Sequence, residues 1–175
     1  MKLQKLTTHY CQLQDRLCID GQTLTGEVVS LWLTCRLMRH LLPTLIHLIT
    51  PTPDVEGNVT TMAQWALTSA LAQKKQEQAV KRPEKPVASD TYTAPSNDYL
   101  VITIEITSVP FLAVLVFSTA TNKQVASIEL ARDHLRQWVA IVYGLWLNTG
   151  WPADKWPAWI KNTEAAVTSG NVVLH

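Results

Sequence analysis

Two segments of the chain change their hydrophobic period from two to about 3.6 within a few residues, as expected where a strand runs directly into a helix. In the first, EVVSLWL alternates so that Val29, Leu31 and Leu33 share one face, and TCRLMRHLLPTLIHLI then repeats leucines at spacings of three and four. In the second, QVASIEL at 124–130 is followed in the same way by ARDHLRQWVAIVYGLWLNTG. The pattern predicts two strand–helix junctions, one in each half of the chain.

Three residues indicate where these helices begin, break and end. Thr34 is a good N-cap for the first helix, because its hydroxyl can accept a hydrogen bond from a free backbone amide. Pro43 lies nine residues later, and we expect it to kink or break the helix because proline has no backbone N–H. Gly150 suits the end of the second helix, since glycine readily adopts the left-handed conformation found there.

The two junctions are related by an offset of 97 residues, which places Val28 on Val125 and Ser30 on Ser127. Two β-type runs precede each junction: LQKLTTHY and LQDRLCI in the first half, YLVITIEITSV and FLAVLVFS in the second. Each half is therefore predicted to be strand, strand, strand, helix. An internal duplication and a chance agreement of a common pattern both explain this repeat.

We predict an α+β fold in which two β-β-β-α units form one domain with pseudo-twofold symmetry. Its sheet is expected to be mostly antiparallel with helices packed on it, because one such unit cannot cover a sheet alone. At 175 residues with 47% apolar content, the chain can bury a sizeable core. The expected parts of the single domain 1–175 are the first unit at 1–50, an inserted helix and flexible linker at 51–98, the second unit at 99–150, and a Trp-rich C-terminal segment at 151–175.

Charge gives little reason to expect a polyanionic partner, because charged residues make up 17% of the chain and the formal net charge is +1. Four arginines, Arg36, Arg39, Arg132 and Arg136, would form a local basic patch for nucleic acid if the two first helices lay side by side. The alternative is that they pair with neighbouring groups at solvated positions, and we favour this alternative.

Tryptophan is abundant, with seven in the chain, and four of them are close together in the C-terminal part. Trp146, Trp151, Trp156 and Trp159 are the candidate interface residues, because partly exposed tryptophans often anchor protein–protein contacts. They could instead pack over the core at the end of the last helix. We favour packing, with a dimer contact as the second interpretation.

No motif in the sequence indicates a catalytic residue, a bound cofactor or a metal. Nucleophile turns, phosphate loops and paired carboxylates are absent from the sequence. The three cysteines lack paired metal-ligand spacing, and His40 and His47 would lie roughly 10 Å apart along a helix. We expect a protein that is not an enzyme, although catalytic groups that converge only in the fold stay an open alternative.

The expected location is the bacterial cytoplasm. The longest uncharged stretch, Gln137 to Ala153, has 17 residues, and a membrane-spanning helix needs about 20 apolar ones. The start of the chain has no continuous apolar segment of a secretory signal. QDRLCIDG and LWLTCRLMRHLLPTL, within residues 14–45, resemble a short motif of small uncharacterised proteobacterial proteins. This resemblance implies a bacterial cytosolic origin and no particular activity.

Three functions follow as hypotheses from these patterns. The first is a non-catalytic adaptor or assembly protein that acts through a homodimer or a partner interface. The second is a nucleic-acid-binding module that uses the four arginines. The third is a small-ligand-binding protein or an enzyme with a pocket between the two halves.

Overall fold

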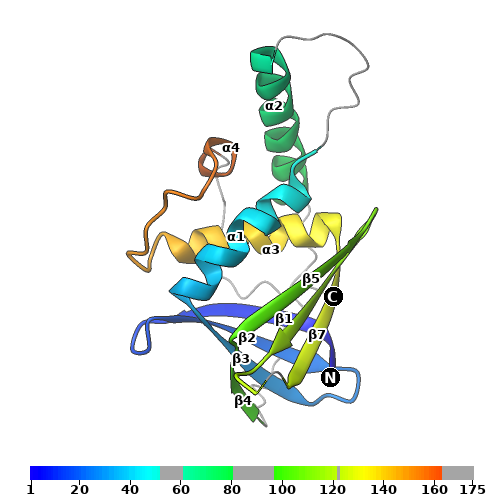
Figure 1. The fold of residues 1–175 in the computed structure, drawn as a ribbon, viewed down its shortest axis with the longest axis vertical. Coiled ribbons are helices and arrows are strands. Elements are labelled where there is room, and N and C mark those ends of the chain that lie inside the picture. The colour runs from blue at the N-terminus through cyan, green and yellow to red at the C-terminus, as the bar shows by residue number, and fades with distance from the viewer. Residues whose placement is uncertain (52–60, 81–96, 122, 163–175) are drawn as a thin grey trace.

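A computed structural model of the chain describes residues 1–51, 61–80, 97–121 and 123–162. Over these residues the protein is a mixed α/β structure with a seven-stranded sheet and four helices (Figure 1). The strands are β1 (Lys2–Cys11), β2 (Arg16–Thr23), β3 (Val28–Thr34), β4 (Asn97–Leu100), β5 (Thr103–Val109), β6 (Leu112–Ser118) and β7 (Gln124–Ala131). The helices are α1 (Cys35–Ile49), α2 (Thr61–Val80), α3 (Arg132–Trp146) and α4 (Ala158–Lys161).

The sheet has the strand order β4-β3-β2-β1-β7-β6-β5, and it is mixed rather than mostly antiparallel. The prediction failed because two pairings, β1 with β7 and β3 with β4, are parallel. The predicted pseudo-twofold is not confirmed. Across the sheet, β3-β2-β1 of the first half is followed by β7-β6-β5 of the second, so equivalent strands appear in the same order.

The two halves nevertheless share an element order, since β1-β2-β3-α1 and β5-β6-β7-α3 are both strand, strand, strand, helix. Helices α1 and α3 each have 15 residues, and both of their bounds differ by the offset of 97 seen in the sequence. Their β3 and β7 strands run directly into them, as the change of hydrophobic period predicted. A common ancestry of the two halves stays a prediction.

The sheet curls so that its two edges meet at Val101 and Ile102. Strands β4 and β5 lie at opposite edges, although only these two residues separate them in the chain. The amide of Val101 donates to the carbonyl of Trp32 on β3 (3.0 Å), and the amide of Ile102 donates to the carbonyl of Ser118 on β6 (2.9 Å). The segment YLVITIEITSV, predicted as one strand, is therefore divided where the chain passes from one edge to the other.

All described helices lie on one side of the sheet (Figure 1). Alternate strand residues such as Leu17, Leu31 and Leu115 are fully buried there against α1 and α3. Apolar residues of both halves form one contiguous core cluster. The opposite face of the sheet carries the alternate residues of the strands, which include the exposed Glu105 and Glu129.

The expected cap is confirmed and the expected break is wrong in α1. The amide of Leu37 donates to Oγ1 of Thr34 at 3.2 Å. The helix continues through Pro43 to Ile49 without interruption, and the side chain of Pro43 is exposed. An outward-facing ring leaves the buried side of the helix unchanged, so packing of that side holds the helix together. Helix α3 ends at Trp146, and Gly150 closes the following turn with φ of 72°.

Helix α2 packs its C-terminal half against α3 and α4, and its N-terminal half projects away from the body (Figure 1). The part of the predicted linker up to position 96 lies outside the described residues, and Asn97 and Asp98 begin β4. The predicted C-terminal segment 151–175 is described only as far as Asn162. None of the described helices combines the length and the apolar content needed to cross a membrane.

Candidate functional site

The four C-terminal tryptophans are packed in the core. Trp146 is 1% exposed, Trp156 is 3%, and Trp151 and Trp159 are both 8%. The ring of Trp146 meets those of Trp151 and Trp156 edge-on, with centroids 5.1 and 5.4 Å apart. The indole N–H of Trp151 donates to Asp15 at 2.7 Å. This agrees with the favoured packing interpretation, and the four rings offer little area to a partner.

The four arginines lie in two separate places along α1 and α3. Arg36 and Arg39 are in the first turns of α1 and line a shallow depression with Lys155, and Arg39 pairs with Asp154 at 3.3 Å. Arg132 and Arg136 instead line a cleft beside the C-terminal end of α1. The structure therefore contains two separate pairs of arginines, and the four do not form the single basic patch that the sequence suggested.

The cleft has a volume of about 1000 Å³ and lies between the end of α1, helices α2 and α3, and the β5–β6 turn. Three cations line it, Lys75, Arg132 and Arg136, with the carboxylate of Asp133. The guanidinium of Arg132 is held by the carbonyls of Leu48 (2.9 Å) and Val109 (3.2 Å). These two contacts hold the guanidinium between the end of α1 and the end of β5.

Arg136 is the most unusual group in this cleft. The residue is only 5% exposed, its Nη1 atom has no hydrogen-bond partner among the described residues, and its Nε is 4.0 Å from Asp133. Burial lowers the pKa of this guanidinium, and nearby Asp133 acts in the opposite direction. A buried cation with a free donor is costly to maintain. Such a donor is also suited to hold an anion.

The projecting half of α2, here called the α2 tip, carries four exposed apolar residues: Met62 and Trp65 on one side of the helix, and Leu67 and Leu71 on the other. These side chains are 82%, 76%, 49% and 37% exposed, respectively. Trp65 lies on the same side of the helix as Ala72, which is fully buried in the core. The side of α2 that packs against the body therefore continues into the α2 tip. There, Trp65 extends beyond the part of the helix that is covered.

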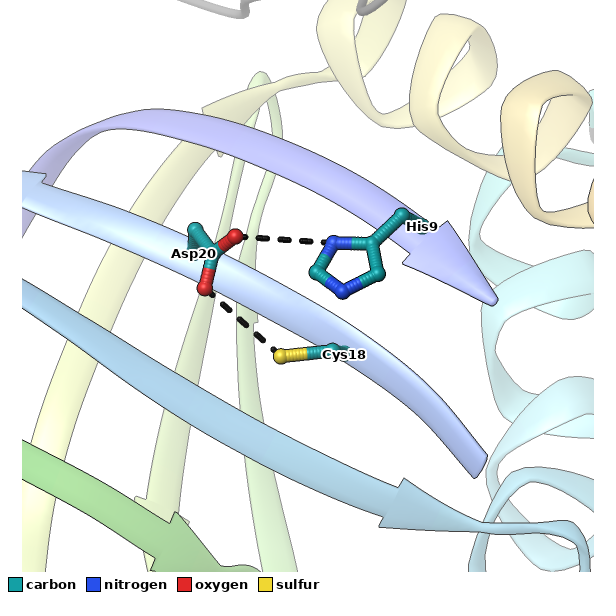
Figure 2. A group of neighbouring side chains, drawn as sticks. All are labelled: His9, Cys18 and Asp20. Atoms are coloured by element: carbon teal, nitrogen blue, oxygen red, sulfur yellow. Dashed lines mark hydrogen bonds and ion pairs between the residues drawn. The ribbon is translucent and has the colours of Figure 1, made fainter. Parts of the chain in front are cut away.

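On the sheet face away from the helices, a cluster of three metal-ligating types lies on the β1–β2 hairpin: His9, Cys18 and Asp20 (Figure 2). The hairpin register places His9 directly opposite Cys18, and Asp20 follows on the same face two residues later. The Asp20 carboxylate lies between the other two, with Oδ2 at 3.5 Å from His9 Nδ1 and Oδ1 at 3.6 Å from Cys18 Sγ.

Neighbouring strands hold this cluster in place. The hydroxyl of Ser30 on β3 donates to Asp20 Oδ1. The ring of Trp32, also on β3, meets His9 edge-on with centroids 6.3 Å apart, and its N–H donates to Asp98 on β4 at 3.2 Å. Desolvation raises the pKa of the Cys18 thiol far above its usual value, and the charge of Asp20 adds to this. The free thiol is therefore protonated and a poor nucleophile, which argues against cysteine catalysis here.

The sequence alone did not indicate this cluster, because the spacing of His9, Cys18 and Asp20 along the chain matches no metal-binding motif. Cys-x-Asp on a strand places both side chains on one face. A tight turn over residues 12–15 would in addition have placed His9 opposite Cys18. The cluster could therefore have been predicted only from the register of the hairpin, which depends on the position of the turn. The sequence pattern placed the start of the second strand at Leu13, inside that turn.

Comparison with known proteins provides no assignment for these features. No protein-family model, curated protein or solved structure matches the chain.

Proposed function

We propose that this protein is a non-catalytic adaptor or assembly protein that forms a homodimer through the α2 tip. The exposure of Trp65 supports the proposal most directly: three-quarters of a large indole faces solvent at the end of a packing stripe. Tryptophans in such positions are typical anchors of protein–protein interfaces. The interface is thus assigned to α2 rather than to the four buried C-terminal tryptophans.

The charge pattern of α2 favours a second copy of the chain as the binding partner of the α2 tip. Residues 61–73 carry no charged side chain, so two copies of this helix can pack together without like-charge repulsion. An uncharged surface also disfavours nucleic acid, whose phosphates are bound mainly by Lys and Arg. Burying the exposed part of Trp65 contributes on the order of 3 kcal/mol before the costs of association. We expect a concentration-dependent dimer, because four side chains at the end of one helix are far fewer than the roughly 20–30 residues per partner of a standard interface.

Light scattering coupled to size exclusion, over a range of protein concentrations, tests this proposal. The wild-type chain is expected to shift from monomer to dimer, and Trp65→Ser should weaken the dimer at least tenfold, since about 1.4 kcal/mol corresponds to that factor. Leu24→Ser is the matched control, because Leu24 is 79% exposed on the β2–β3 turn, away from α2. A chain that stays monomeric at all concentrations, or a dimer that Trp65→Ser leaves intact, contradicts the proposal.

The proposed setting is the bacterial cytoplasm. Cys11, Cys18 and Cys35 are all free thiols in the structure, which suits a reducing compartment. The proposal also includes an ancestral duplication of the β-β-β-α unit, supported by the matched bounds of α1 and α3.

The buried Arg136 favours a second candidate function, the binding of a small anion in the cleft between the two halves. Phosphate is the simplest probe, because the cationic side chains of Lys75, Arg132 and Arg136 line the cleft together and can hold its oxygens. In a thermal unfolding assay at constant ionic strength, phosphate should stabilise the wild-type chain and not Arg136→Met. Arg36→Met, at an exposed site outside the cleft, should respond like wild type. An equal shift in all three proteins would indicate a general salt effect and remove this candidate.

A further inference from the structure

The His9–Cys18–Asp20 cluster supplies one imidazole nitrogen, one sulfur and one carboxylate oxygen, and these atoms all lie within 4.8 Å of one another. A tetrahedral zinc ion has bonds of about 2.0–2.1 Å to N and O and about 2.3 Å to S, so neighbouring ligand atoms are about 3.3–3.6 Å apart. Asp20 Oδ2 is 3.5 Å from the His9 nitrogen, and Asp20 Oδ1 is 3.6 Å from the Cys18 sulfur. For an ion bound by one carboxylate oxygen, one edge of the coordination tetrahedron is therefore already close to the required length, and a rotation of the carboxylate would adjust the other.

The ligands come from a rigid part of the fold. His9 and Cys18 are cross-strand partners in the middle of a continuous antiparallel ladder, and Asp20 is on the same ladder. The Ser30 hydroxyl binds Asp20 Oδ1 and so restricts the carboxylate, as outer hydrogen bonds commonly do at metal centres. Small side-chain rotations would bring the three atoms to one ion without any change in the backbone.

The surroundings favour a cation with one open coordination position. Cys18 is fully buried, whereas the side chains of His9 and Asp20 are 43% and 26% exposed, so one side of the cluster faces solvent. Asp98 lies close enough to act on Cys18 electrostatically, which adds a second negative charge. Mixed nitrogen, sulfur and oxygen ligands suit Zn²⁺ rather than Mg²⁺ or Ca²⁺, which prefer oxygen alone.

We propose that His9, Cys18 and Asp20 form a three-ligand Zn²⁺ site on the helix-free face of the sheet, with a fourth position open to water or to a ligand from another molecule. This site is independent of the α2 tip, so each proposal can fail without the other. Without metal, the same three residues form a hydrogen-bonded and ion-paired group, and the experiment has to distinguish these two states.

Metal binding to the full-length chain, reduced and treated with a chelator, tests the site. Zn²⁺ titrated in a calorimeter should bind with about one equivalent per chain. Co²⁺ should give the absorption of a tetrahedral site together with a thiolate-to-cobalt charge-transfer band, which reports directly on a sulfur ligand. Cys18→Ser should abolish the charge-transfer band, and Asp20→Asn should weaken Zn²⁺ binding at least tenfold.

Two further variants keep the test decisive. Cys35→Ser changes a thiol on α1, outside the cluster, and should bind both metals like wild type. His9→Gln alters a partly exposed ring and serves if Cys18→Ser does not fold; it should also weaken Zn²⁺ at least tenfold. No binding by the wild-type chain, or a Co²⁺ spectrum without the thiolate band, overturns the proposal. Equal losses in Cys18→Ser and Cys35→Ser overturn it as well.

Discussion

At the scale of single residues, Arg136 shows a conflict between stability and a chemical role. Its side chain is buried beside α2, where Gln76 donates to the Arg136 carbonyl at 2.9 Å, yet Nη1 of the guanidinium has no partner in the part of the chain that the structure describes. Burying a charge without full hydrogen bonding costs several kcal/mol, and folding alone gives no reason to keep it. A conflict of this kind is typical of a site where binding outweighs stability.

Arg136→Met is therefore expected to stabilise the fold by about 1 kcal/mol, because methionine fills similar space without a charge to desolvate. Urea unfolding measures the change in free energy. Arg36→Met, at an exposed position, should change it by less than about 0.5 kcal/mol. A clear loss of stability in Arg136→Met would mean that the guanidinium makes a net favourable contribution to folding.

Cys35 provides a pH-dependent prediction. Desolvation raises the pKa of this thiol above its usual value of 9.0, and the nearby Arg39 cation opposes the shift. Only the thiolate reacts with iodoacetamide, so at a pH of about 8 Cys35 should react more slowly in the folded than in the unfolded chain. Arg39→Ala should raise the pKa and slow the reaction further, whereas Arg39→Lys should retain most of the effect. Mass spectrometry of the Cys35 peptide gives these rates, and faster alkylation in Arg39→Ala would contradict the prediction.

At the scale of elements, the two strand–helix junctions differ in their caps. Thr34 caps α1 with its side chain, whereas Ala131, at the same place before α3, makes no side-chain cap. The two junctions therefore differ by one capping hydrogen bond, while the helices that follow them have the same length.

Thr34→Ala should destabilise the protein by about 1 kcal/mol, and Ala131→Thr should stabilise it by up to about that amount, because a capping hydroxyl satisfies an otherwise free helix amide. Chemical denaturation measures both variants against the wild type. Ala131 is exposed, so the added hydroxyl meets no core packing. If Ala131→Thr were neutral while Thr34→Ala was costly, the difference would come from local geometry at the second junction.

The sequence predicted such local features well, because they depend on neighbouring residues. The Thr34 cap and the two strand–helix junctions follow from side-chain chemistry and hydrophobic period. The effect of Pro43 was not predicted correctly, since packing of the buried side of α1 outweighed the lost hydrogen bond. The pairing of β1 with β7 and the His9–Cys18–Asp20 cluster could not be predicted either, because both depend on register between strands that the hydrophobic pattern leaves undetermined.

At the scale of the whole molecule, the two halves share a core and two short parallel strand pairings, β1 with β7 and β3 with β4. The β1–β7 ladder consists of Lys2 opposite Ser127 and Leu3 opposite Ile128. Across the core, the indole of Trp138 on α3 donates to Thr8 on β1 at 3.1 Å. Because the ladder is so short, side-chain packing around Leu3 is important for holding the halves together.

Gly21→Ala tests how tightly Leu3 is packed, since a Cβ at position 21 would overlap Leu3 Cδ1. We expect a destabilisation of about 1–3 kcal/mol from overpacking. In the Leu3→Ala background the clashing side chain is absent, so adding Gly21→Ala should lower the free energy of unfolding much less. The coupling energy in a double-mutant cycle should be at least about 0.5 kcal/mol. Urea unfolding of the four proteins provides the cycle. Strictly additive effects would show that Leu3 moves aside without cost.

The point where the two sheet edges meet also bears on how the chain avoids aggregation. An open edge offers free amides and carbonyls on which a strand of another molecule can add, a common route to domain swapping and fibres. At Val101 and Ile102 these amides are already bonded to β3 and β6 of the same chain. This corner of the sheet is therefore protected against strand addition, and a controlled assembly of copies is better served by a helix such as α2.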